Sequence, residues 1–285
     1  MRGILKWLGI GLGALMILAL GAVAVIYLAS EWMVRKTYDR PLSSIALPTD
    51  SFALAEGQRL ATVRGCYNGC HGERLDGGVF VDQPLLARLV APNLTQVVAQ
   101  YTDAELERVI RHGIRRDRKS TLGMPSSMFY HLRDEDLGAI IAFLRSAPVT
   151  EGPPTEISLG PLARLGLVLG KYRPQAQMID HDAPRLAVRD TSDHMTFGKY
   201  LALTVCTECH GLDLRGDPDG SSPNLVVAAT YSVEDFTRLM RTGMASGDRE
   251  LRLMSEVARG RFSHLTDGEI KALHRYLSTL SPGAQ

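Results

Sequence analysis

The longest apolar stretch of the chain lies near its N-terminus. Trp7 to Ala29 is a run of 23 residues without a charged side chain. As an α-helix this run would be about 35 Å long, enough to cross a hydrocarbon core of about 30 Å. A cleaved signal peptide usually has a shorter apolar core, about 7–15 residues, and Tyr27 and Trp32 stand where interfacial aromatic residues are expected. The pattern predicts an uncleaved transmembrane anchor over residues 1–30 and a stalk over residues 31–50.

Beyond residue 50 the apolar positions follow a helical period. One apolar stripe recurs at i, i+3, i+4 and i+7 and is formed by Leu137, Ile140, Ile141 and Leu144. Thr102 and Thr266 each stand three residues before a glutamate, which is the sequence of a capping box at a helix start. We find no sustained strand alternation, so the predicted fold class is all-α.

Two halves of this region repeat the same landmarks in the same order. The matched residues are Gly57 and Gly198, His71 and His210, Pro92 and Pro223, Gly113 and Gly243, and Met124 and Met254. From the last matched glycine to the matched methionine the gap is 11 residues in both halves. This agreement predicts two tandem copies of one small helical domain, over residues 51–148 and 191–282.

The linker between the copies, residues 149–190, is rich in proline and glycine. Within it residues 157–170 are mostly apolar, with leucines at 159, 162, 165 and 169, and they include Arg164. This stretch is too short to span a membrane. We expect it to pack between the domains and to give one compact unit, because exposed leucines need a cover. The less favoured alternative is that it rests on the membrane surface.

Composition narrows the function further. The 285 residues are 45% hydrophobic and 22% charged, with a net charge of +1, which describes a globular chain. A net charge this close to zero lacks the excess of basic residues that is typical of nucleic-acid-binding proteins. Any partner protein must therefore dock on local patches rather than through overall charge.

The second copy contains the clearest chemical motif. Cys206-Thr207-Glu208-Cys209-His210 is a C-x-x-C-H sequence, the signature of covalent c-type haem attachment. The two thiols add to the two vinyl groups, and the next residue directs an imidazole at the iron. Two alternative interpretations of this motif are disfavoured. Half of a zinc site would need a second pair of ligands, and this copy has no further cysteines. A thioredoxin-like redox pair would need a strand followed by a helix, which the sequence does not predict here.

The first copy departs from this pattern by one residue. Cys66 and Cys70 are separated by three residues and followed by His71. Asn68 and Gly69 tolerate positive φ, so the extra residue is expected to bulge out while both sulfurs still reach the vinyl groups. The repeat places His71 at the position of His210, which predicts a second haem here.

The sixth iron ligand should be a methionine. Among ten methionines, Met124 and Met254 are matched by the repeat, just before the last helix of each copy. Their rivals Met128 and Met244 align with Ala258 and Ile114, which cannot bind iron. His131 and His264 also match each other, and we expect both at the surface.

Taken together, Ser51 to Leu280 resembles the cytochrome c superfamily, specifically the bacterial membrane-anchored dihaem cytochromes c that serve periplasmic dehydrogenases and oxidases. The resemblance implies that the domains lie in the periplasm and the N-terminus inside. It implies that the first and last helices of each copy cross, with Gly57 near Phe143 and Gly198 near Tyr276. It also implies that the carbonyls of Pro92 and Pro223 accept a hydrogen bond from the axial histidines and fix their rings.

His/Met ligation leaves no open position on iron and favours its reduced state. The expected function is therefore electron transfer without catalysis, from a dehydrogenase or a quinol-oxidising complex to a soluble cytochrome or a terminal oxidase. The alternative is a dihaem enzyme such as a peroxidase or a thiosulfate dehydrogenase, which needs a labile sixth ligand. A haem-based gas sensor is disfavoured as well, because it would need an open position on the iron and a signalling output domain.

Overall fold

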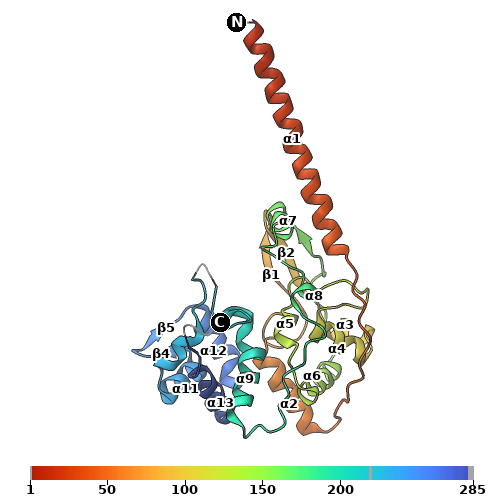
Figure 1. Ribbon diagram of the computed structural model, residues 1–285. Coiled ribbons are helices and arrows are strands. Elements are labelled where there is room, and N and C mark those ends of the chain that lie inside the picture. Colours follow the sequence, from red (N-terminus) through yellow and green to blue (C-terminus); the bar gives the residue numbers. More distant parts are fainter. Residues whose placement is uncertain (1, 218–219, 282–285) are drawn as a thin grey trace.

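The computed structural model describes residues 2–217 and 220–281. A single long helix, α1 (Arg2–Arg35), rises from two adjoining helical bodies that hold the rest of the chain (Figure 1). The first body continues directly from α1, and the second lies beside it, away from the helix (Figure 1).

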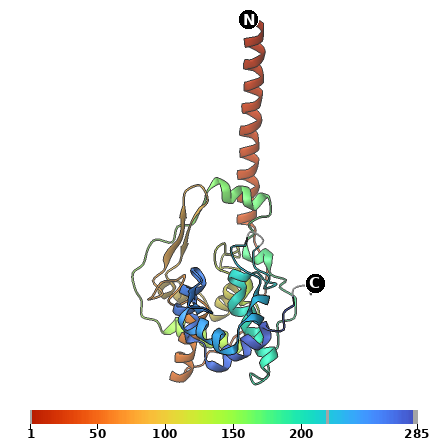
Figure 2. The same ribbon diagram turned by 90° about the vertical axis from the view of Figure 1, so that its left-hand side faces the viewer.

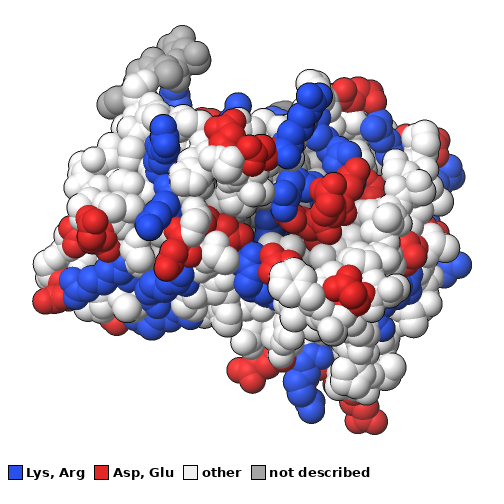
Figure 3. All heavy atoms as spheres, turned by 90° about the horizontal axis from the view of Figure 1, so that it is seen from below, with Lys and Arg blue, Asp and Glu red and all other residues white. Residues whose placement is uncertain are grey.

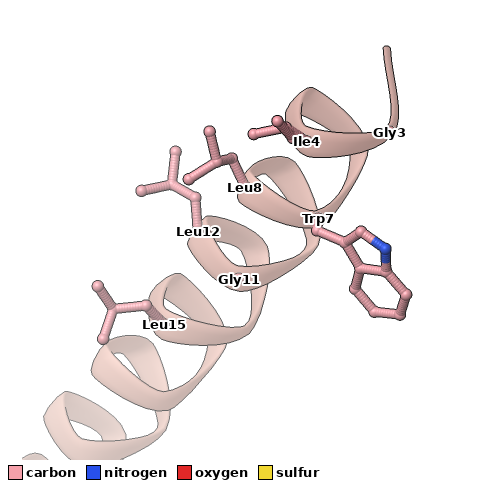
Figure 4. Close-up of a pocket in the computed structure, with 7 residues that line it drawn as sticks. All are labelled: Gly3, Ile4, Trp7, Leu8, Gly11, Leu12 and Leu15. Atoms are coloured by element: carbon pink, nitrogen blue, oxygen red, sulfur yellow. The ribbon is translucent and has the colours of Figure 1, made fainter. Parts of the chain in front are cut away.

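Helix α1 projects away from the bodies and contacts them mainly at its base, around Ser30. It is the one described helix that is long and apolar enough to cross a membrane, and Ser30 is its one buried residue. It continues beyond the predicted end at residue 30, to Arg35. Figure 4 shows Leu8, Leu12 and Leu15 projecting outward from it, along a shallow groove that has no opposite wall. This apolar exterior needs a cover from outside the chain.

Each body is organised around a crossing of its first and last helices. The helical segments of the first body are α2 (Ser51–Val63), α3 (Leu94–Val97), η1 (Val98–Gln100), α4 (Asp103–His112), α5 (Ser126–Phe129) and α6 (Asp134–Ser146). The crossing of α2 and α6 is at Gly57, where an added Cβ would lie 2.0 Å from the carbonyl oxygen of Ala139 and 3.1 Å from Cβ of Phe143. Only glycine permits so close an approach.

The second body repeats this crossing. Its helical segments are α9 (His194–Leu201), the π-helical turn η2 (Ala202–Cys206), α10 (Thr207–His210), η3 (Leu225–Thr230), α11 (Val233–Thr242), α12 (Leu253–Gly260), η4 (Phe262–His264) and α13 (Asp267–Leu277). Here α9 meets α13 at Gly198, where a Cβ would lie 2.1 Å from the carbonyl oxygen of Ala272 and 2.8 Å from Cβ of Tyr276. Both expected crossings are present.

The helix ends follow the sequence signals. The capping boxes at Thr102 and Thr266 form at the starts of α4 and α13. Helices α4 and α11 both end on a glycine in the left-handed region, Gly113 at φ 66° and Gly243 at φ 74°.

The chain is mainly helical, as expected from the sequence, but five short strands are also present among the described residues. They are β1 (Gly78–Gln83), β2 (Ala87–Ala91), β3 (Ser158–Leu159), β4 (Met244–Ala245) and β5 (Arg249–Glu250). The first two form an antiparallel hairpin with an irregularity between Val79 and Val81, and β3 adds to it through Ala87 and Leu159. The irregular register and the brevity of the strands explain why no sustained alternation is visible in the sequence.

The two bodies touch directly rather than through the linker. One hydrophobic cluster includes residues of both, such as Ile141 of α6 and Tyr200 of α9. Arg59 of α2 donates hydrogen bonds of 2.8 and 2.9 Å to the carboxylate of Glu269 at the start of α13. The compact arrangement expected from the sequence is thus present, although the contacts that hold it are different.

The apolar part of the linker does not lie between the bodies, which corrects the sequence-based expectation. Residues 157–170 form β3 and α7 (Pro161–Val168), and α7 packs against α1. Farther along, α8 (Gln175–Met178) packs on α5 of the first body. The linker therefore follows the first body up to the base of α1, because α1 and the hairpin offer its apolar residues a partner there.

Candidate haem sites

The two predicted axial histidines have the same surroundings. Nδ1 of His71 lies 2.9 Å from the carbonyl oxygen of Pro92, and Nδ1 of His210 lies 2.9 Å from that of Pro223. Both rings are buried, and the hydrogen bond fixes which nitrogen carries the proton. Among the described residues no protein group hydrogen-bonds to either Nε2. That nitrogen would therefore be available to bind iron, and the residues present fit a haem.

A matched loop brings each proline to its histidine. In the first domain the amide of Gly77 donates to the carbonyl of His71 at 2.9 Å, and the amide of Leu94 donates to Leu75 at 2.8 Å. The second domain has the same pair of bonds, from Gly216 to His210 at 2.8 Å and from Leu225 to Leu214 at 2.9 Å. The geometry is equal although the His-to-Pro spacing is 21 residues in one domain and 13 in the other.

The extra residue between Cys66 and Cys70 is accommodated by a tight turn. Asn68 adopts a φ of 56°, as its residue type allows, and the amide of Cys70 donates to the carbonyl of Gly65 at 2.9 Å. In the second domain no such turn is needed, because Cys206 ends the π-helical turn and Cys209 lies in α10.

None of the four cysteines is paired in a disulfide. Burial raises the pKa of the Cys66 thiol to about 11 and that of Cys206 to about 12, so both are protonated at neutral pH. Among the described residues no group of three or more His, Cys, Asp or Glu side chains could hold a metal ion. The arrangement thus suits thioether attachment rather than a zinc site.

Met124 lies in a loop that the linker and the hairpin hold in place. The hydroxyl of Tyr172 donates to the carbonyl of Leu122, and the amide of Gln175 donates to Thr121 at 3.1 Å. The ring of Phe80, from β1, lies against Gly123. The thioether side chain itself is partly buried against the hydrophobic cluster.

Met254 is held within its own domain. It lies in the first turn of α12, where its amide donates to the carbonyl of Leu251 at 3.1 Å, and it is partly buried against the cluster. The rival Met128 is a core residue with 1% of its surface exposed, and Met244 belongs to β4.

The two Cys-Cys-His motifs are linked by one residue that the sequence analysis missed. Arg261, after α12, donates to the carboxylate of Glu208 at 2.9 Å and to the carbonyl of Val63 at 3.2 Å. Its guanidinium carbon would be 2.8 Å from a Cβ on Gly65. Because Glu208 lies inside the second motif and Gly65 just before the first, the two attachment sites face each other across the domain boundary.

Of the two matched histidines expected at the surface, one is exposed and the other is not. His264 is exposed as expected. His131 is half-buried, and its Nδ1 accepts a hydrogen bond of 3.0 Å from the amide of Leu186 in the linker. This contact fixes the linker on the first domain.

Comparisons with known proteins agree with this geometry. The sequence model of the cytochrome c family matches residues 54–148 and 196–281. The chain is 25% identical over 300 residues to the fructose dehydrogenase cytochrome subunit of Gluconobacter japonicus, covering 87% of this chain and 61% of that protein. It is 25% identical over 259 residues to the alcohol dehydrogenase (quinone) cytochrome c subunit of Komagataeibacter europaeus, covering 79% and 54%. It is 23% identical over 265 residues to the gluconate 2-dehydrogenase cytochrome c subunit of Pantoea cypripedii, covering 79% and 58%. The chain thus spans little more than half the length of these relatives.

Proposed function

Because the chain belongs to the cytochrome c family, with both domains matched, we propose that it is a membrane-anchored dihaem electron carrier serving a dehydrogenase. Cytochrome c domains bind haem c covalently, and the similar proteins are cytochrome subunits of dehydrogenases rather than catalytic subunits. Electron transfer is therefore the general function. The number of haems, the ligands, the partner and the anchor are our proposals.

Each domain supplies one complete set of haem-binding residues. Cys66, Cys70, His71 and Met124 would hold the first haem, and Cys206, Cys209, His210 and Met254 the second. A haem, when bound, supplies an iron that changes its oxidation state by one electron. The carbonyls of Pro92 and Pro223 orient the imidazoles, and a thioether on the opposite side would raise the potential.

The observation that carries the proposal is the Arg261 bridge. Its contacts with Glu208 and with the backbone before Cys66 bring the two attachment sites together. Electron tunnelling falls steeply with distance, so a second carrier in the same chain is useful when the two haem edges are close. This proximity favours a two-step relay over two independent carriers.

The anchor and the location are supported by α1. Most of its apolar surface has no partner in the described chain, which suits a lipid environment. Haem attachment to c-type cytochromes takes place outside the cytoplasm, which supports domains in the periplasm and an N-terminus inside. Figure 3 shows Lys and Arg interspersed with Asp and Glu over the face opposite α1. A partner dehydrogenase, quinol-oxidising complex, soluble cytochrome or terminal oxidase would therefore dock on a local patch.

Binding of carbon monoxide to the purified, reduced full-length protein tests the proposal. Two six-coordinate His/Met haems would leave the reduced spectrum unchanged at neutral pH. A dihaem peroxidase or thiosulfate dehydrogenase, which needs a labile ligand, would show a carbon monoxide adduct at one haem. Co-purification of a dehydrogenase subunit from native membranes would support the partner class, and recovery with an oxidase alone would contradict it.

A further inference from the structure

Helix α7 turns an apolar face outward beside the base of α1. Ala163 and Leu167 are buried, whereas Leu162 is 54% and Leu169 62% exposed. The exposed residues recur at helical spacing, so α7 is held by one face and presents leucines on the other.

The buried side of α7 is fixed to the end of the proposed membrane span. The guanidinium of Arg164 donates to the hydroxyl of Ser30 at 3.0 Å and to the carboxylate of Glu31 at 3.1 Å. The same group lies 4.9 Å from the ring centre of Tyr27. These contacts hold α7 at the level where α1 would leave the hydrocarbon core, and Figure 2 shows α7 lying across α1 there.

The tip of the β1–β2 hairpin reaches the same level. Leu85 is 65% exposed, and its carbonyl accepts a hydrogen bond of 3.0 Å from the amide of Leu162. The carbonyl of Leu86 accepts another, of 2.8 Å, from the amide of Gly160. The two backbone bonds thus place the hairpin tip beside α7, and we group their exposed leucines as the leucine surface, made of Leu85, Leu86, Leu162, Leu165 and Leu169.

Three exposed basic residues follow the two helices directly in the chain. Lys36 follows α1, and Lys171 and Arg173 follow α7. Apolar side chains that enter the headgroup region together with a basic rim are the combination by which peripheral helices bind anionic bilayers.

We propose that this leucine surface rests in the headgroup region of a phospholipid bilayer and fixes the first domain against the membrane. The inference rests on the anchor proposed above and goes beyond it, because an anchor alone would let the domains swing. Lipid is favoured over a protein partner because the surface is continuous with α1, which would itself be surrounded by lipid. The hairpin begins at Gly78 and ends at Ala91, next to Pro92, so docking restrains the loop that brings Pro92 to His71.

Photolabelling from the bilayer tests the inference. The full-length protein is placed in vesicles of phosphatidylethanolamine and phosphatidylglycerol that contain a diazirine lipid, illuminated, digested and mapped by mass spectrometry. Label is expected on α1, on α7 and on the hairpin tip. Phe52, which is 81% exposed in α2 at the far end of the first body, serves as the apolar control and should carry none.

Variants separate the possible failures. Replacing Leu162, Leu165 and Leu169 together by serine should abolish the α7 label and leave the α1 label and the haem content unchanged, whereas Phe52→Ser should change nothing. Label on α1 without label on α7 in the wild-type protein would overturn the inference and leave the anchor intact. Absence of label on α1, with the protein released from the vesicles, would instead refute the anchor. Loss of the α7 label in native membranes compared with vesicles would identify a protein as the occupant and also overturn the inference.

Discussion

In the second domain 13 residues lead from His210 to Pro223, whereas in the first 21 residues lead from His71 to Pro92 and include the β1–β2 hairpin. The His–Pro distance is nevertheless 2.9 Å in both. The insertion is tolerated because the bonds from Gly77 and Gly216 to the histidine carbonyls close the loop at its base. The loop between the two residues can thus gain a hairpin without any change in the distance between the histidine ring and the proline carbonyl.

The two candidate sites differ more in the segments that hold their methionines than in the position of their histidines. Met254 is held by residues of its own domain, whereas the Met124 loop is held by Tyr172 and Gln175 of the linker and by Phe80 of the hairpin. The first site therefore depends on segments that the second site lacks.

The largest expected effect is the loss of one haem. The mature wild-type protein should carry a mass excess of two covalent haems. Replacing Cys66 and Cys70 by alanine should remove one, and replacing Cys206 and Cys209 should remove the other, because each pair supplies the thioethers of one haem. Mass spectrometry after acid–acetone extraction measures this. An unchanged haem content in the first variant would mean that the three-residue spacing has been misinterpreted.

Next in size is a change of potential confined to one haem. Met254→Ala should lower the potential of the second haem by roughly 0.1–0.3 V, a part of the roughly 0.8 V range that axial ligands span. It should also abolish that haem's weak long-wavelength sulfur-to-iron band. Met124→Ala should do the same for the first haem. Met244→Ala is the control in a redox titration, and an equal effect there would contradict the repeat alignment.

Substitutions at the helix crossings should affect the two domains alike. Gly57→Ala and Gly198→Ala would each place a Cβ about 2 Å from a backbone carbonyl oxygen, and overpacking of this kind costs about 1–3 kcal/mol or more. Urea unfolding followed at each haem should show the loss. Gly260→Ala, where nothing lies within 4 Å, is the matched helical control, and it should gain about 0.5–1 kcal/mol. If only one of the two glycine substitutions lowered stability, the expectation that both crossings are equally close-packed would be wrong.

The smallest effect is a pH dependence that the first domain alone should show. Burial and the neighbouring His181 lower the pKa of His112 to about 3, whereas the matched residue in the second domain is Thr242. As the pH falls, His112 is protonated in the unfolded chain before it is protonated in the folded one. Its contribution to the free energy of unfolding is therefore fully present above pH 6.5 and is lost as the pH falls toward 3. The limiting slope is about 1.4 kcal/mol per pH unit. Urea midpoints between pH 7 and 5 should show it, and His112→Leu should reduce it. A variant with the wild-type slope would exclude His112 as its source.

The sequence was most informative where a feature depends on spacing along the chain. The repeat matched Gly57 with Gly198, and the resemblance to the cytochrome c superfamily implied the helix crossings at these glycines. Three-residue spacing predicted the capping boxes at Thr102 and Thr266. The repeat also favoured Met124 over Met128, which lies in the core. The ligand roles themselves stay predictions.

Contacts between distant segments could not be predicted in this way. Arg261 and Val63 are 198 residues apart, and nothing in the sequence around either residue indicates the other. The leucines of residues 157–170 were recognised as an apolar stripe, but the stripe alone does not say whether a domain, α1 or a membrane will cover it. The hairpin did leave one signal, the longer His-to-Pro spacing of the first copy.

The pairing of Leu159 with Ala87 has a consequence for how this chain can be divided and inherited. The recognisable repeat of the first domain ends before the linker, yet β3, from the linker, completes the sheet that the hairpin begins. A recombination point or an engineered cut near residue 150 would therefore remove a strand from the first domain, together with α7 and the residues that hold the Met124 loop. The linker contributes no described strand to the second domain. Of the two domains, the second is therefore the better suited to transfer into another protein.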